Sequence, residues 1–254
     1  MNFKDRFVFC LLSGITIIFS GCSKNDTTTG LPPINAANNK TTGYSGKDFL
    51  TTNSFNSLKI EIQYMPGFQP DAASVNNITS FLSSLINKPN GITVTQQQIP
   101  SGNKNSYTIN DIAVIEQNNR SYFNSGSQLA VYVLVTDGNY SDPNVLGVAY
   151  RNTSLCLLGK KIFDNSGGIG QANRTKLLST VSEHEFGHLL GLVDLGTPMQ
   201  ANHIDAAHGN HCNVQSCLMY YAAETTDLLG VLITGNIPAL DSQCLNDLKS
   251  NGGK

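Results

Sequence analysis

The chain has 254 residues, with 16 Lys or Arg against 18 Asp or Glu, which gives a formal net charge of −2. Because the charges nearly balance and no basic run occurs, a surface built to neutralise nucleic-acid phosphates is excluded. About two hundred residues follow the polar N-terminal region, enough for one domain with a good core.

The first residues have the pattern of a secretory signal. Lys4 and Arg6 precede an apolar run over residues 7–19 that is too short to span a bilayer. The segment Phe19-Ser20-Gly21-Cys22 resembles the bacterial lipobox, with Phe19 where leucine is usual. The resemblance implies that residues 1–21 are removed and that Cys22 is lipidated, anchoring the protein to the membrane of a bacterial cell envelope, extracytoplasmically. A plain secretory signal is the alternative.

Residues 22–50 are rich in Thr, Asn, Gly, Ser and Pro and contain few apolar side chains. This composition predicts a flexible polar tether. The folded domain is therefore expected over residues 51–254.

The apolar periodicity of that domain predicts a mixed α/β (α+β) fold. It indicates strands over 58–64, 92–99, 129–135, 145–150 and 154–163. It indicates helices over 71–86, 109–118 and 241–249. The strand over 154–163 is our candidate for the sheet edge along which an extended substrate lies. An interior strand without substrate contact is the alternative.

The segment His184-Glu185-Phe186-Gly187-His188 carries the chemistry. At 3.6 residues per turn, His184 and His188 project from one helix face and can share a zinc ion. Glu185 lies beside them without being a ligand. It can therefore act as the base that activates zinc-bound water for peptide hydrolysis.

The residues after this segment resemble the metzincin clan of zinc endopeptidases. Gly191 holds the clan's glycine position, and Met219 in Cys217-Leu218-Met219-Tyr220-Tyr221 matches the methionine of the Met-turn. The resemblance implies a twisted mixed sheet with an active-site helix, followed by an irregular C-terminal part. It also implies that Tyr221 lies near the metal, placed to donate to the developing oxyanion.

Two residues compete for the third zinc ligand. Asp194 lies where the clan motif expects a ligand, three residues after Gly191. His211 belongs to a His-Cys-x4-Cys-x-Met segment that resembles the archaemetzincin pattern, in which the histidine is the ligand, and we favour it. His203 and His208 are expected to be solvated loop histidines.

Four cysteines remain after the signal and the lipidation site, an even number in an oxidising compartment. We expect disulfides between Cys212 and Cys217 and between Cys156 and Cys244, with free buried thiols as the alternative. Archaemetzincins use cysteines in this region for a second zinc, through a Cys-x-x-Cys that this chain lacks. One catalytic zinc is therefore expected.

Together these features predict a membrane-anchored zinc metalloendopeptidase, monomeric, acting on protein or peptide substrates and not on nucleic acid. One alternative is a hydrolase of the same fold that acts on cell-wall or glycoprotein targets. Another is a surface lipoprotein whose zinc site is not catalytic. An intact Glu185 argues against the latter, because a structural site needs no base.

Overall fold

The computed structural model describes residues 30–254, so the predicted signal over residues 1–21 and lipidation at Cys22 lie outside the described residues. The main sheet has five strands in the order β2-β1-β4-β7-β6. The strands are β1 (Ser57–Tyr64), β2 (Ile92–Gln98), β4 (Gln128–Val135), β6 (Gly147–Arg151) and β7 (Ser154–Leu157). All neighbours pair in parallel except β6, which pairs antiparallel with β7 and forms one edge.

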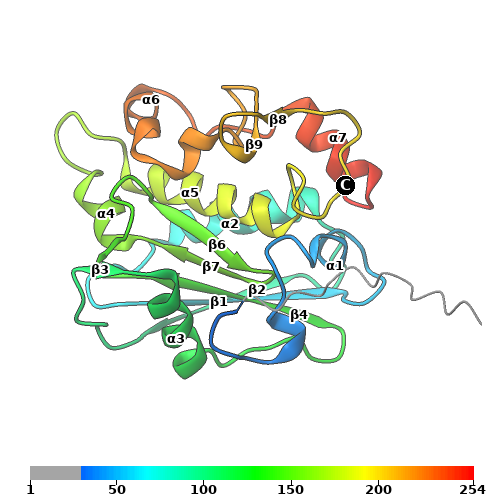
Figure 1. The fold of residues 1–254 in the computed structure, drawn as a ribbon, viewed down its shortest axis with the longest axis horizontal. Helices are drawn as coiled ribbons and strands as arrows, with labels where there is room; N and C mark the ends of the chain where they lie inside the picture. Colours follow the sequence, from blue (N-terminus) through cyan, green and yellow to red (C-terminus); the bar gives the residue numbers. More distant parts are fainter. Residues whose placement is uncertain (1–29) are drawn as a thin grey trace, which may run out of the picture.

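Helices cover both faces of this sheet (Figure 1). Helices α2 (Ala72–Leu85) and α5 (Arg174–Leu189) lie on one face, and α3 (Ile109–Asn119) lies on the other. A polar side chain caps each of them; the Asp71 carboxylate, for example, accepts from the Ser74 N–H at the start of α2. After Gln128, the central strand β4 has only apolar and aromatic residues and is fully buried, as expected for a parallel strand covered on both faces.

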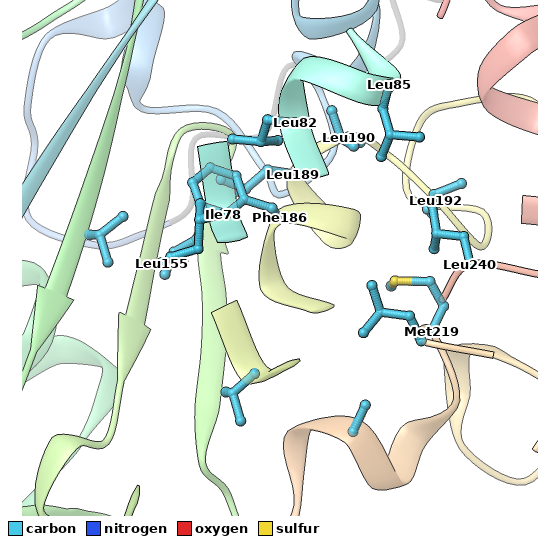
Figure 2. Packing of buried hydrophobic residues seen from close by; sticks show 14 of the residues in the cluster. Ile78, Leu82, Leu85, Leu155, Phe186, Leu189, Leu190, Leu192, Met219 and Leu240 are labelled. Carbon is cyan, nitrogen blue, oxygen red and sulfur yellow. The ribbon is translucent and has the colours of Figure 1, made fainter. Parts of the chain in front are cut away.

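The larger hydrophobic core lies between the sheet and the α2–α5 pair. In Figure 2, Phe186 and Leu189 of α5 pack near Ile78 and Leu82 of α2 and Leu155 of β7. The same core continues to Met219 and Leu240 of the C-terminal part (Figure 2). This continuity holds the irregular C-terminal half against the helix that carries the histidine motif.

The prediction of a long strand over 154–163 is wrong. The strand ends at Leu157, and a short helix, α4 (Gly159–Asp164), follows it. Periodicity could not separate the two, because short apolar runs suit a strand or a buried helix equally. Strand β6 forms the edge on this side of the sheet, and β7 lies inside the sheet between β4 and β6.

The predicted tether over 22–50 is also wrong where the structure describes it, and the domain begins before residue 51. The segment forms a 3-10 helix, η1 (Ala36–Asn38), and α1 (Gly46–Leu50). Asn38 is buried, and its side-chain amide donates to Asn124, Ala130 and Thr153, while Phe49 and Leu50 join the larger core. A polar segment can thus be ordered when its buried polar groups are hydrogen-bonded.

The C-terminal half has short elements joined by turns, as the sequence predicts. They are β8 (Ile204–Asp205), β9 (Gly209–Cys212), η2 (Tyr221–Glu224), η3 (Thr226–Leu228), α6 (Leu229–Thr234) and α7 (Ser242–Ser250). Strands β3 (Ser106–Tyr107) and β5 (Asn139–Tyr140) form a separate pair. The predicted mixed α/β class is confirmed. Among the described residues, no helix has the length and apolarity needed to cross a membrane.

Candidate active site

Helix α5 carries the first two candidate ligands. It begins after Asn173, whose side chain accepts from the Lys176 N–H, and it is buried from Leu177 to Leu189. His184 and His188 project from the same face, with their Nε2 atoms 3.0 Å apart. The predicted helical spacing therefore places two imidazole nitrogens at a common point.

His211 reaches the same point from β9. Its ring centroid lies 5.3 Å from that of His184 and 5.1 Å from that of His188. Asp194 does not: its side chain is exposed, and the residue adopts a left-handed backbone with φ 68° after the helix has ended. The structure thus brings His211, and not Asp194, together with the two histidines of α5.

Backbone carbonyls orient two of these rings. The Nδ1–H of His184 donates to the Leu218 carbonyl at 2.7 Å, and the Nδ1–H of His211 donates to the His208 carbonyl at 2.9 Å. Each ring therefore presents an unprotonated Nε2 to the common point. Hydrogen bonds of this kind fix the tautomer and rotation of histidine ligands.

Met219 lies fully buried beneath the motif helix. A Cβ on Gly187 would lie 2.2 Å from the Met219 sulfur, so only glycine allows this close approach. The Met219 carbonyl accepts from the Cys212 N–H at 2.7 Å, next to His211 in the chain. The predicted turn methionine thus lies in a segment that supports both His184, through Leu218, and the strand of His211.

Glu185 is buried against the edge strand. Neither of its carboxylate oxygens has a hydrogen-bond partner among the described residues. Burial raises the pKa of Glu185 well above its ordinary value, and the nearby Glu224 charge raises it further. Gly147 of β6 makes room for it, since a Cβ there would lie 2.7 Å from Glu185 Oε1. A buried carboxylate held without a partner is suited to accepting a proton.

Glu224, which the sequence did not single out, is the fourth member of the cluster. Its Oε1 lies 3.3 Å from His211 Nε2, and its Oε2 lies 3.6 Å from His184 Nε2 and 3.8 Å from His188 Nε2. Glu224 lies at the end of η2, five residues after Met219, and is part of neither the histidine motif nor the Met-turn motif. The only available signal was an acidic residue shortly after the turn methionine.

The charges of this cluster oppose one another. Burial, together with the neighbouring His184, lowers the pKa of His188 well below its ordinary value. Burial would also lower the pKa of His211, but the Glu224 carboxylate outweighs it and raises that pKa. Likewise, His184 and His211 hold the pKa of Glu224 below its ordinary value against the effect of burial. These shifts of pKa favour the neutral form of His188 and the charged forms of His211 and Glu224.

A cavity of about 320 Å³ opens over the cluster. Its lining includes Glu185, His188, His211 and Glu224, together with Val148 and Ala149 of the edge strand. Tyr221 is half-buried, and its ring stacks on that of His208 with the centroids 3.6 Å apart. The described ring contacts of Tyr221 are with His208 and Tyr220, so its predicted role at the metal stays a prediction.

The residues present fit a zinc ion. One donor atom from each of His184, His188, His211 and Glu224 lies within 4.8 Å of all the others. His211 Nε2 is buried and makes no hydrogen bond within the described part of the chain. Its close polar neighbour is Glu224 Oε1 at 3.3 Å, and a ligand that paired with both groups would offset the cost of burying them. Imidazole and carboxylate are both ordinary zinc donors.

Comparison with solved structures identifies the architecture. The structure matches a crystal structure of archaemetzincin from Methanopyrus kandleri with a TM-score of 0.51 and 15% sequence identity, covering 77% of this chain and 96% of that chain. The chain shares the archaemetzincin fold. No protein-family model matches the sequence, and a search of curated proteins found no match. The likeness to archaemetzincin is therefore one of fold.

The four cysteines are free in the structure, so both predicted disulfides are wrong. Cys156 lies in a second core on the other side of the sheet, away from Cys244. Cys217 Sγ instead faces Cys244 Sγ at 3.7 Å, far longer than the roughly 2.05 Å of a disulfide bond. An even cysteine count was compatible with bridges, but it did not determine which thiols meet.

These thiols form a second candidate metal group. Donor atoms of Cys212, Cys217, Asp241 and Cys244 lie within 4.8 Å of one another. Two sulfurs on one tetrahedral zinc, each bonded at about 2.3 Å, are roughly 3.8 Å apart. The 3.7 Å between Cys217 and Cys244 is close to that separation. Asp241 and Cys244 have the spacing of a Cys-x-x-Cys pair with a carboxylate in the first position.

His203 also faces this cysteine group, and its prediction as a solvated histidine is wrong. It is fully buried, with Nδ1 3.4 Å from Cys212 Sγ and 4.0 Å from Cys244 Sγ. Its Nε2 lies 2.7 Å from Asp247 Oδ2. A carboxylate on the far nitrogen is the usual partner of a metal-binding imidazole. His208, by contrast, is exposed and pairs with Asp205.

Proposed function

We propose that the protein is a zinc metalloendopeptidase in which His184, His188 and His211 hold the metal. The observation that carries the proposal is the buried, unpartnered Glu185 carboxylate next to three converging imidazoles. The fold likeness to archaemetzincin, together with the metzincin-like motif, supports the same chemistry. A fold hosts many functions, so the site bears most of the argument.

When bound, zinc would lower the pKa of a water molecule and polarise the scissile carbonyl. The remaining steps belong to the chain. Leu218 and His208 hold the rings of His184 and His211 in place through their carbonyls. Glu185 accepts the proton of the attacking water on a carboxylate oxygen and passes it to the leaving nitrogen.

The edge strand β6 is the proposed support for substrate. Val148 and Ala149 line the cavity beside Glu185, and the outer edge of β6 carries no further strand in the described sheet. An extended peptide can pair with such an edge. Donation by Tyr221 to the developing oxyanion remains part of the proposal and requires its hydroxyl to turn toward the cavity.

The proposal is tested by incubating purified protein with a mixed peptide library. We expect internal peptide bonds to be cleaved, because the cavity is open to solvent and the proposed base, Glu185, lines it. Cleavage should stop on removal of metal with a chelator and return when zinc is added. Protein that binds zinc at the three histidines but cleaves no peptide would argue for the alternative below.

A non-catalytic zinc site is the second candidate function, and Glu224 is the observation that favours it. Structural zinc sites are closed by four protein donors, whereas catalytic sites keep one position open. Glu224 lies within 3.3–3.8 Å of all three histidine nitrogens and can supply that fourth donor. Against this alternative, Glu185 has no evident structural role as a buried carboxylate without partners.

We also propose a structural zinc bound by Cys212, Cys217 and Cys244, with the fourth donor from His203 or Asp241. It would hold β9 and α7 together beside the catalytic loop. We expect protein purified under reducing conditions to contain two zinc equivalents. Cys244→Ser should remove one equivalent and lower the melting temperature, because metal binding here contributes folding free energy. One equivalent in the wild type, with the thiols of Cys212, Cys217 and Cys244 free to alkylation, would contradict this site.

Anchoring to a bacterial envelope membrane through lipid on Cys22 is proposed from the sequence alone. Expression in a bacterium followed by membrane fractionation tests it. We expect the full chain in the membrane fraction and Cys22→Ala in the soluble fraction. The same distribution for both proteins would refute lipidation.

A further inference from the structure

Glu224 has no part in the proposed hydrolysis, yet its side chain faces all three histidine nitrogens. The contacts are made by both carboxylate oxygens, Oε1 toward His211 and Oε2 toward His184 and His188. No Lys or Arg ion pair of Glu224 occurs among the described residues. Its nearest polar partners are therefore the candidate ligands themselves.

The separations are within a few tenths of an ångström of those between atoms that share one tetrahedral ion. Zinc bonds nitrogen and oxygen at about 2.0–2.2 Å, which places two donors of one tetrahedron roughly 3.3–3.6 Å apart. The distances from Glu224 to the histidine nitrogens are 3.3, 3.6 and 3.8 Å. The Nε2 atoms of His184 and His188 are 3.0 Å apart. The Glu224 carboxylate thus lies where a fourth zinc donor would lie beside the three imidazoles.

The other nearby carboxylates do not take this position. Glu185 lies under β6 and is absent from the set of mutually close donor atoms, and the Asp194 side chain is exposed. The two glutamates of the site therefore divide into a base beside the histidines and a donor facing them. Only Glu224 can close the metal site from within the described chain.

The backbone of Glu224 is held in place while its side chain reaches the cavity. Its carbonyl accepts from the Leu146 N–H at 2.8 Å, and the Thr226 N–H donates to the Asn144 carbonyl at 3.0 Å. These bonds tie the end of η2 and the start of η3 to the residues immediately before β6. The side chain is 23% exposed and lines the open cavity. Rotation of the side chain alone can thus withdraw the carboxylate.

We propose that Glu224 is a fourth protein donor that closes the zinc site at rest, and that the site opens when this carboxylate leaves the metal. This inference rests on the proposed function, since it concerns the same three histidines. The protein would be latent until substrate along β6 displaces the carboxylate. Catalytic zinc needs an open coordination position, and this displaceable ligand, which we call the latch, would open that position only when substrate binds.

Two binding measurements on Glu224→Gln and Glu224→Ala test the proposal, and neither depends on activity. Loss of a carboxylate donor should weaken zinc binding by roughly tenfold or more, measured by competition with a chromophoric chelator. Loss of a competing donor should also tighten binding of acetohydroxamate to the cobalt-substituted protein, followed by its visible absorption. Opposite changes in the two affinities are what a displaceable ligand produces.

Glu185→Gln is the matched control, because it neutralises a carboxylate in the same cavity that is not a donor. Its zinc affinity should equal that of the wild type. Unchanged zinc and hydroxamate affinities in both Glu224 variants would overturn the inference. If Glu224→Ala does not fold, the isosteric Glu224→Gln decides.

These measurements distinguish failure of the Glu224 proposal from failure of the proposed peptidase function. A wild type that cleaves peptides, with Glu224 variants of unchanged affinities, removes the latch and leaves the peptidase. The predicted affinity changes, in a wild type and variants that cleave nothing, leave Glu224 as the fourth ligand of a non-catalytic zinc. In that case the latch is overturned as well, because opening of the zinc site is not followed by peptide hydrolysis.

Discussion

Glu185→Gln should lower the rate of peptide cleavage by about 100- to 10,000-fold, the usual contribution of a general base. The substitution is isosteric, so the side chain should still fit under Gly147. Because Glu185 is not among the converging donors, zinc content should stay at the wild-type value. Metal analysis and cleavage rates on the same preparations check both parts.

The matched comparison is the thermal stability of the two proteins. Glu185 is buried without a hydrogen-bond partner, so its replacement by the isosteric glutamine breaks no hydrogen bond. We therefore expect the melting temperature of Glu185→Gln to stay the same or rise. A variant with full activity would exclude Glu185 as the base, whereas one that is inactive and unfolded would reveal a structural role instead.

His211→Ala should lower zinc affinity by orders of magnitude and eliminate cleavage, because the centre loses a direct metal bond. Asp194→Asn is the matched control. Asn tolerates the left-handed backbone found at this position, so the variant should fold normally. Since the Asp194 side chain is exposed and lies outside the donor cluster, zinc affinity should not change. Chelator competition measures both affinities.

The opposite pattern would restore the shorter ligand motif. If His211→Ala kept its zinc while Asp194→Asn lost it, the third ligand would be the carboxylate three residues after Gly191. The loop between residues 193 and 210 would then have to be arranged differently from the structure. Equal loss in both variants would implicate general unfolding, which circular dichroism detects.

Local spacing allowed much of the candidate site to be predicted. His184, Glu185 and His188 follow from helical geometry, and His211 is implied by the resemblance of the segment up to Met219 to the archaemetzincin pattern. Glu224 could not be predicted in this way. Its position depends on η2, whose backbone is set by a hydrogen bond to Leu146, almost eighty residues earlier in the chain.

Fold prediction succeeded where amphipathic periods were long and failed where polar groups were buried. Strand β1 and helix α2 have clear periodicity and β4 is a continuous apolar run, and each was predicted to within about two residues. The order of residues 36–50 depends on buried amide hydrogen bonds such as those of Asn38, which composition does not reveal. Cysteine parity likewise predicted bridges, whereas the structure gathers three thiols around His203 and Asp241.

The central claim is that one zinc ion is held by His184, His188 and His211. Zinc-edge anomalous diffraction from crystals of the zinc-loaded protein tests it most directly. We predict a strong difference peak bonded at about 2.0–2.1 Å to the Nε2 atom of each of the three histidines. Zinc-loaded crystals with no peak at that point, or with the peak bonded to Asp194 in place of His211, would contradict the account.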